Sequence, residues 1–269
     1  MQKYKVEEDN GRIDQYLANR MPELSRSSIQ KLINTGLVTV DGEIVKSKHK
    51  VNYGQVISVT FDPLQLEEIP DIDLPIIYED DDCLVIDKPI GILTHSKGQF
   101  NPEATVATFI RPKLVNLTGE RAGIVHRLDR ATSGIIICAK TPEALSWLQK
   151  QFSFRKVKKT YIAKIKGAIE PSEAIIDMPI ERNPKKPQLF RTGKNGKPAK
   201  THYKVLKTDG SFQLLELTPE TGRTHQLRVH LAKLDHPILG DQFYDGEKSD
   251  RLYLHAHKLE ITLLKNHER

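Results

Sequence analysis

A short polar cluster between two apolar runs carries the side chains of this sequence best suited to chemistry. Residues 126–133 read HRLDRATS, and the apolar run at 135–139 that follows them predicts a buried strand. Asp129 is the carboxylate of the cluster, and Arg127 and Arg130 flank it. Nearby guanidinium groups keep a carboxylate ionised, as a nucleophile or general base requires. Because an Asp beside Arg is more often a structural ion pair, the cluster alone does not establish a site.

Two more polar clusters lie at predicted strand ends. In the first, Lys159 and Thr160 precede Tyr161, which opens an apolar strand. In the second, residues 221–228 read TGRTHQLR, and Arg223 leads into a predicted helix. Taken alone, the tyrosine is typical of a residue that packs against its neighbours. The arginine is typical of one that donates a hydrogen bond to a backbone carbonyl. Together the three clusters offer an ionised acid, a cation and an aromatic face, which suit a nucleobase or sugar.

Other kinds of chemistry find little support in the sequence. It has 10 histidines but lacks HExxH and any Cys/His spacing typical of zinc ligands, so we expect no catalytic metal. Ser133 lies outside a Gly-x-Ser-x-Gly turn, which argues against a serine hydrolase. No glycine-rich loop that would bind a nucleotide phosphate is present, so we expect no cofactor.

The first part of the chain predicts a small module over residues 1–62, followed by an acidic, proline-punctuated linker at 63–73. Within the module, a helix begins at Arg12, and a second helix has its N-cap at Ser25 and ends at Gly36. A hairpin then turns at 41–42, whose sequence Asp-Gly favours a tight turn.

Residues 74–269 predict a second, larger domain. A hairpin turns at 80–82, and Thr141 and Pro142 begin a helix as its N-cap and first residue. A further helix is predicted at 226–234. Strands are expected at 161–165, 201–206, 212–217, 253–254 and 259–264. Strands outnumber helices and hairpins outnumber crossovers, so we expect an α+β fold with a mixed, mostly antiparallel central sheet and flanking helices.

Charge is unevenly distributed along the chain. The net charge is +6, but residues 150–200 hold 14 Lys+Arg against 4 Asp+Glu, a local excess of 10 positive charges. Such a segment predicts a polyanionic partner, although a solvated lysine face is the alternative. The apolar runs are too short to span a bilayer and the N-terminus is polar, so we expect neither membrane insertion nor secretion. Two cysteines in apolar segments are typical of free thiols in a reducing cytoplasm.

The motifs taken in order resemble those of the RluA/RluD-type RNA pseudouridine synthases. The resemblance covers residues 70–265 and four separated motifs: KPIG at 88–91, HRLD at 126–129 with TSG at 132–134, KTY at 159–161, and RTHQLRVH at 223–230. Residues 12–60 resemble the alpha-L RNA-binding module first seen in a small-subunit ribosomal protein. The resemblance implies the pseudouridine synthase fold and isomerisation of uridine within RNA without a cofactor.

The resemblance also implies roles for individual residues. Asp129 is the essential carboxylate, which either attacks the sugar or abstracts a sugar proton, and Arg223 is its ion-pair partner. Tyr161 stacks on the target base, Leu227 packs against it, and Arg127 fills the space left by the flipped nucleotide. Further substrate contacts are expected from His126, Lys88, Lys159, Arg26 and Lys31.

The RNA-binding module favours a large structured substrate, so we expect ribosomal RNA of the large subunit. Transfer RNA is the alternative substrate, and a non-catalytic ribosome-assembly factor is the alternative function. We expect a cytoplasmic monomer. The sequence does not identify the modified uridine.

Overall fold

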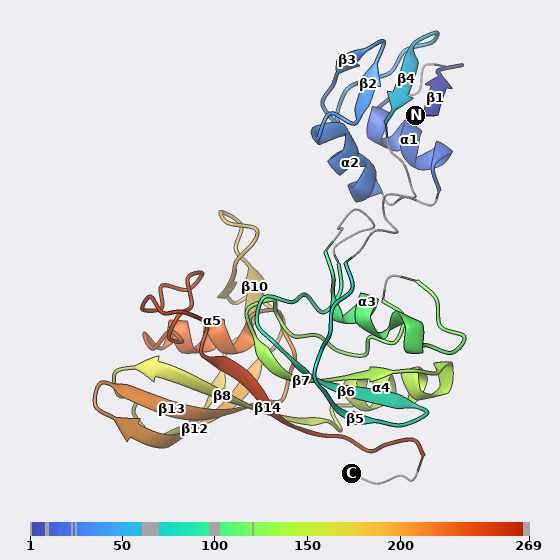
Figure 1. Cartoon of the computed structure of the whole chain (residues 1–269). Coiled ribbons are helices and arrows are strands. Elements are labelled where there is room, and N and C mark those ends of the chain that lie inside the picture. Colours follow the sequence, from blue (N-terminus) through green and yellow to red (C-terminus); the bar gives the residue numbers. More distant parts are fainter. Residues whose placement is uncertain are drawn as a thin grey trace. The chain divides into compact units, whose positions relative to one another are not determined.

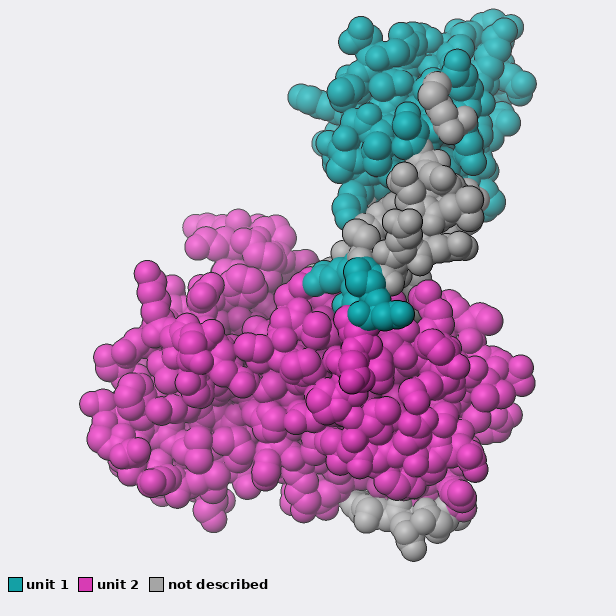
Figure 2. Space-filling model, in the orientation of Figure 1, with its two compact units in different colours: residues 1–71, 96–104 teal, residues 72–95, 105–269 magenta. Residues whose placement is uncertain are grey.

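The structure is a computed structural model that describes residues 2–8, 11–22, 24, 26–60, 70–96, 103–119 and 121–265. The chain divides into two compact units, Met1–Asp71 with Ser96–Ala104, and Ile72–His95 with Thr105–Arg269 (Figure 2). The expected N-cap at Ser25 and most of the expected linker lie outside the described residues.

The first unit packs two helices against a four-stranded antiparallel sheet of order β1-β4-β2-β3 (Figure 1). Its elements are β1 (Gln2–Lys5), α1 (Ile13–Arg20), α2 (Arg26–Asn34), β2 (Val38–Val40), β3 (Glu43–Ile44) and β4 (Val56–Val59). The predicted hairpin turn is present between β2 and β3, where Asp41 and Gly42 both have positive φ. Buried side chains such as Ile13, Ile33 and Ile57 form one core between the helices and the sheet.

A buried carboxylate joins the two helices of this unit. Asp14 is fully buried in α1 and accepts hydrogen bonds from Arg12, Arg26 and Gln30, the last two in α2. Burial acts to raise the pKa of Asp14, but the hydrogen bonds from Arg12, Gln30 and Arg26 outweigh it and lower the pKa. A carboxylate partnered in this way stabilises the helix pair while it is ionised.

The second unit is built on an eight-stranded sheet of order β5-β6-β7-β14-β8-β13-β12-β9 (Figure 1). Its strands are β5 (Ile76–Glu79), β6 (Cys83–Lys88), β7 (Ser133–Ala139), β8 (Lys158–Lys166), β9 (Glu173–Asp177), β12 (Lys200–Asp209), β13 (Phe212–Pro219) and β14 (Leu254–Glu260). β7 and β14 pair in parallel, and the other neighbouring strands pair antiparallel. The α+β fold with a mixed, mostly antiparallel sheet is therefore confirmed.

Helices cover both faces of this sheet. α3 (Val106–Ile110) packs on one face of β6 and β7, against side chains such as Leu84 and Ile136. α4 (Pro142–Ser153) packs on the other face, against side chains such as Cys83 and Ile137. Alternate residues of a strand point to opposite faces, so the two helices lie on opposite sides of this strand pair. α5 (Gln226–Lys233) packs on β8, β12 and β13. In the described part of the chain, no helix is long and apolar enough to span a membrane.

Several local predictions hold and one is wrong. The Thr141 hydroxyl accepts a hydrogen bond from Ala144 N at 3.2 Å, as expected of the N-cap of α4. The two strands expected at 253–254 and 259–264 are instead the single strand β14, because pairing with β8 continues from Leu254 to Glu260. A short hairpin of β10 (Ile180–Arg182) and β11 (Phe190–Thr192), which the sequence analysis missed, follows β9.

The parallel pair at the centre of the sheet depends on Gly134. Its φ is +113°, and a Cβ placed there would lie 2.2 Å from the carbonyl oxygen of Ala256 in β14. Any side chain would therefore push β14 away from β7. This close approach brings β14 beside the start of β7, directly after the HRLD motif.

Candidate active site

Hydrogen bonds on both sides of Asp129 hold the loop before β7 in place. The Thr94 hydroxyl donates to Leu128 O at 2.9 Å and accepts from Leu128 N at 3.1 Å. After Asp129, the carbonyl of Arg130 accepts from Gly91 N at 2.8 Å. Leu128 is buried, whereas the Asp129 side chain keeps 22% of its surface exposed. The loop is thus fixed to the core while its carboxylate reaches solvent.

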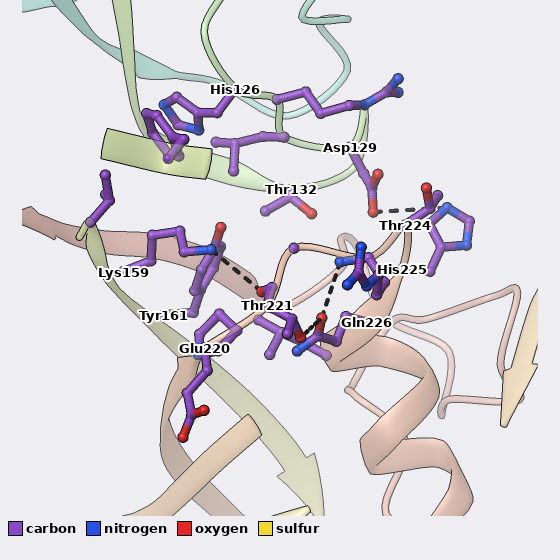
Figure 3. Close-up of a pocket in the computed structure, with 18 of the residues that line it drawn as sticks. His126, Asp129, Thr132, Lys159, Tyr161, Glu220, Thr221, Thr224, His225 and Gln226 are labelled. Carbon is purple, nitrogen blue, oxygen red and sulfur yellow. Dashed lines mark hydrogen bonds and ion pairs between the residues drawn. The ribbon is translucent and has the colours of Figure 1, made fainter. Parts of the chain in front are cut away.

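The Asp129 side chain lines a cavity of about 510 Å³ within the second unit. Seven of the residues expected at the site line this cavity (Figure 3). They are His126, Arg127, Asp129, Lys159, Tyr161, Arg223 and Leu227. The three clusters, which lie far apart in the sequence, therefore share one concave site of a size that suits a small organic group such as a nucleoside.

Arg228, rather than Arg223, is the arginine paired with Asp129. The Nη1 atom of Arg228 lies 3.6 Å from Oδ2 of Asp129. Arg223 instead donates from Nε to Pro198 O at 3.0 Å, so its expected role as the ion-pair partner is wrong. The physical reason is the packing of α5: Arg223 lies in the loop before this helix, whereas Arg228 lies on its first turn, which packs against the sheet beside Asp129.

A second carboxylate, which the sequence analysis missed, orients Arg228. Asp241 is fully buried and accepts from Nε and Nη2 of Arg228, both at 2.7 Å. This bidentate contact leaves Nη1 to face Asp129. Burial alone would lower the pKa of Arg228, but the bonds to Asp241 prevail and raise it. Arg228 is therefore a fixed positive charge behind the loop that carries Asp129.

Tyr161 faces the cavity from β8, between Leu217 of β13 and Ala256 of β14. Burial, and the nearby charge of Asp129, raise the pKa of Tyr161 well above its ordinary value. The side chain is therefore a protonated phenol throughout the neutral range. It offers the cavity an aromatic face and a hydroxyl that can donate.

Gln226 fixes the loop at 221–226, which lines the cavity (Figure 3). Its Oε1 accepts from the Thr221 hydroxyl at 2.7 Å and from Arg223 N at 3.0 Å. Its Nε2 donates to Lys200 O at 2.9 Å and to the Thr201 hydroxyl at 3.0 Å. Because all four hydrogen-bonding positions of this buried amide are used, the loop at 221–226 has one arrangement.

A histidine and a lysine of the cavity have surroundings that the sequence did not reveal. The side chain of His126 stacks on Phe152 at 4.7 Å, its Nε2 accepts from Ile137 N, and burial lowers its pKa to about 3. Lys159 lines the cavity and donates to Thr221 O at 3.4 Å. Burial lowers the pKa of Lys159. His126 is thus neutral, with one nitrogen committed to the backbone.

Lys88 was expected to contact the substrate, and the structure contradicts this. Its side chain is fully buried, does not line the cavity, and donates from Nζ to Pro89 O and Ile92 O, both at 2.9 Å. Burial lowers the pKa of Lys88 to about 8, although the charge of Asp129 acts in the opposite direction. Lys88 shapes the turn at 89–92, because a proline-containing turn after a strand presents carbonyls that need a donor.

The remaining expected contacts, Arg26 and Lys31, belong to α2 of the first unit. Arg26 pairs with Asp14 at 3.1 Å and keeps 44% of its side chain exposed. No group of three or more His, Cys, Asp or Glu side chains able to hold a metal ion occurs in the described ranges.

Comparison with known proteins identifies the family. Residues 82–233 match the family model described as RNA pseudouridylate synthase, and residues 11–57 match the S4 domain. The chain belongs to the RNA pseudouridylate synthase family. Most of the residues matched by the family model lie in the second unit. The S4 match lies in the first unit, within the module that resembles the alpha-L type.

Relatives match most of the chain. A protein named "Ribosomal large subunit pseudouridine synthase D" from Nitrosomonas europaea is 39% identical over 93% of this chain and 77% of its own length. An "Uncharacterized RNA pseudouridine synthase" from Aquifex aeolicus is 40% identical over 91% of this chain and 80% of its own. The solved structure of "Human RNA Pseudouridylate Synthase Domain Containing 1" has 30% identity and a TM-score of 0.60, over 73% of this chain and 82% of that one.

Proposed function

We propose that this protein converts uridine to pseudouridine in large-subunit ribosomal RNA. The observation that carries the proposal is the shared cavity of Asp129, Tyr161 and Arg228, which provides an ionised acid, a phenol and a fixed cation. The relatives named as large-subunit enzymes support the choice of RNA, and so does the S4 domain. With a ribosomal substrate, we also propose that the protein acts in the cytoplasm.

The reaction rearranges one nucleoside and conserves its atoms. The bond between the uracil nitrogen and the sugar breaks, the base turns, and carbon 5 bonds to the same sugar carbon. Carbon 5 loses a proton and the freed nitrogen gains one, so neither a redox partner nor an energy source is needed. Asp129 serves the first step either by attacking the sugar or by abstracting a sugar proton, and in both roles it acts as a carboxylate, with Nη1 of Arg228 3.6 Å from its Oδ2.

The cavity must receive a nucleotide that has left its helix. Extrusion of a paired base costs a few kcal/mol. Stacking on an aromatic ring returns about 1–3 kcal/mol, and the face of Tyr161 is placed to provide it. Leu227 is the apolar neighbour of the base. Arg127, whose side chain is exposed at the cavity, is suited to occupy the gap left in the RNA stack.

Charged groups outside the cavity contact the RNA backbone in this proposal. The basic segment at 150–200 supplies exposed lysines such as Lys185 and Lys186, near the β10–β11 hairpin. In the first unit, Arg26 and Lys31 of α2 supply further positive charge. Such contacts set affinity and its salt dependence, whereas the cavity sets the chemistry.

The test is to map pseudouridines in RNA from a strain that lacks the gene. Loss at positions of large-subunit ribosomal RNA, restored by the wild-type gene and not by Asp129→Asn, supports the proposal. Loss confined to transfer RNA would change the substrate, and no loss in any RNA would favour an assembly factor without activity. We also propose that the enzyme acts as a monomer, which light scattering of the free protein and of its RNA complex tests.

A further inference from the structure

His225 approaches the catalytic carboxylate from a strained backbone position. It immediately precedes α5 with φ 56° and ψ 20°, a left-handed conformation that a residue with a Cβ seldom adopts. Its side chain points at Asp129, and its Nε2 lies 3.8 Å from Oδ2 (Figure 3). Strain of this kind persists where the surroundings hold a side chain in a required place.

The side chains of Arg228 and His225 make their nearest contacts with Asp129 at the same carboxylate oxygen. Nη1 of Arg228 lies 3.6 Å from Oδ2, and Nε2 of His225 lies 3.8 Å from Oδ2. No hydrogen bond from the residues that the structure describes reaches Oδ1, and neither nearest contact falls on it. The two carboxylate oxygens are therefore inequivalent before RNA binds.

A contact on the opposite side of the imidazole favours one position for its hydrogen. Nδ1 of His225 lies 2.8 Å from the hydroxyl oxygen of Tyr244, and that oxygen accepts from Phe190 N at 3.1 Å. The phenol has a single hydrogen, and Nδ1 is its one acceptor within the described residues. When Tyr244 donates to Nδ1, a neutral imidazole carries its hydrogen on Nε2, which faces Asp129.

The charges around the ring agree with a neutral imidazole. Arg127 and Asp129 face it from the loop before β7, Arg228 from α5, and Asp241 from the segment after α5. Burial lowers the pKa of His225 and outweighs the opposing effect of Asp129. Edge contacts with the rings of Phe190 and Tyr244, at 5.7 and 5.6 Å, complete the surroundings.

We propose that His225 is a positioning residue. Tyr244 orients its ring so that the Nε2 hydrogen points at Oδ2 of Asp129. Together with Arg228, His225 thereby occupies Oδ2 and leaves Oδ1 to react with the ribose. The contacts of 3.6 and 3.8 Å shorten to hydrogen bonds when RNA fills the cavity. The proposal rests on the function proposed above, because it assigns the reacting atom of that reaction.

Three variants of the full-length protein test the proposal kinetically. His225→Gln keeps an amide hydrogen near the Nε2 position, His225→Leu removes it, and Tyr244→Phe keeps the ring but removes the hydroxyl that orients the imidazole. The assay measures the single-turnover rate at saturating RNA and, separately, the RNA affinity. The RNA is a large-subunit fragment that the wild-type enzyme converts.

We expect His225→Leu to lower the rate roughly ten- to a hundredfold, the effect of one hydrogen bond to a charged group, with affinity changed less than about threefold. His225→Gln should recover most of the rate, and Tyr244→Phe should lie between the two. The proposal is wrong if the Gln variant is as slow as the Leu variant, or if Tyr244→Phe matches the wild type. It also fails if the losses follow melting temperature instead of side-chain chemistry.

A measurement without RNA separates this proposal from the proposed function. Nitrogen-15 NMR of the histidine side chains in the full-length protein reports the tautomer of each ring. We expect a neutral Nε2–H signal that is absent from His225→Gln and becomes a mixture of tautomers in Tyr244→Phe. An Nδ1–H tautomer or a doubly protonated ring in the wild type would overturn the inference, whether or not the enzyme forms pseudouridine.

Discussion

Asp241→Asn tests whether a buried ion pair behind the active site holds the catalytic machinery in place. Asp241 is fully buried and Arg228 is 5% exposed, with two contacts of 2.7 Å between them. Removal of one partner from a buried pair costs about 3–5 kcal/mol, because the remaining charge is left uncompensated. The asparagine keeps one acceptor oxygen, so we expect the lower end, about 3 kcal/mol. In a domain of this size, that loss lowers the melting temperature by ~6–12 °C.

The chain offers a matched control for this substitution. Lys166 and Glu247 form an ion pair that is also 2.7 Å long, but their side chains are 61% and 43% exposed. Exposed pairs contribute about 0–1 kcal/mol, so Glu247→Gln should shift the melting temperature by less than ~4 °C. The two substitutions remove the same kind of charge, and burial is the property that distinguishes them.

The assay must report on the second unit alone, because two units need not unfold together. Trp147, the single tryptophan of the chain, lies in α4 of that unit, so its fluorescence provides this probe. Below the melting temperature, Asp241→Asn should also slow pseudouridine formation about tenfold or more, because the guanidinium that faces Asp129 is no longer fixed. Equal stability losses for Asp241→Asn and Glu247→Gln would refute the reasoning about burial.

Four further outcomes are expected. Asp129→Asn should keep RNA affinity but form no product in a single-turnover assay, and residual pseudouridine would contradict its role. The pKa of Asp14 is lowered in the folded state, so its stabilisation is complete above the unfolded value of about 3.9 and is lost as pH falls below it. NMR signals of residues 11–57 in the full-length protein should show this loss, and Asp14→Asn should lack that pH dependence. Gln226→Leu leaves buried partners unsatisfied and should destabilise the second unit by about 1–3 kcal/mol in urea unfolding, a prediction that an unchanged midpoint would refute. The double variant Lys185→Ala, Lys186→Ala should reduce the slope of log affinity against log salt by roughly one to two at an unchanged saturated rate.

The local parts of the site could be predicted from the sequence because each is a continuous motif. The strand after Asp129 is an apolar run, and Tyr161 belongs to another, so the sequence already predicts both strands, although β8 begins at Lys158 and not at Tyr161. The hairpin at Asp41 and the helix cap at Thr141 follow from turn and cap chemistry in the same way. In each case the determining residues lie within a few positions of one another.

The partners of Asp129 could not be predicted, because their placement depends on long-range packing. Arg223 and Arg228 are both arginines of the same motif, and the position of α5 against the sheet decides which one reaches the carboxylate. Asp241 and Tyr244 lie in an irregular segment after α5, where no periodic pattern exists to show which way a side chain points. Lys88 was misassigned for a related reason: a lysine in a motif suggests a phosphate contact, and its complete burial is visible in three dimensions alone.

The positions of Asp129 and Tyr161 depend on the order of strands at the centre of the sheet. Asp129 precedes β7 and Tyr161 lies in β8, and β14 is inserted between these two strands. Two strand spacings of about 4.8 Å separate the backbones of β7 and β8 by roughly 10 Å. The cavity lined by Asp129 and Tyr161 lies at this part of the sheet. Since Gly134 permits the parallel contact between β7 and β14, a glycine outside the cavity helps to set the distance between the strands that carry these groups.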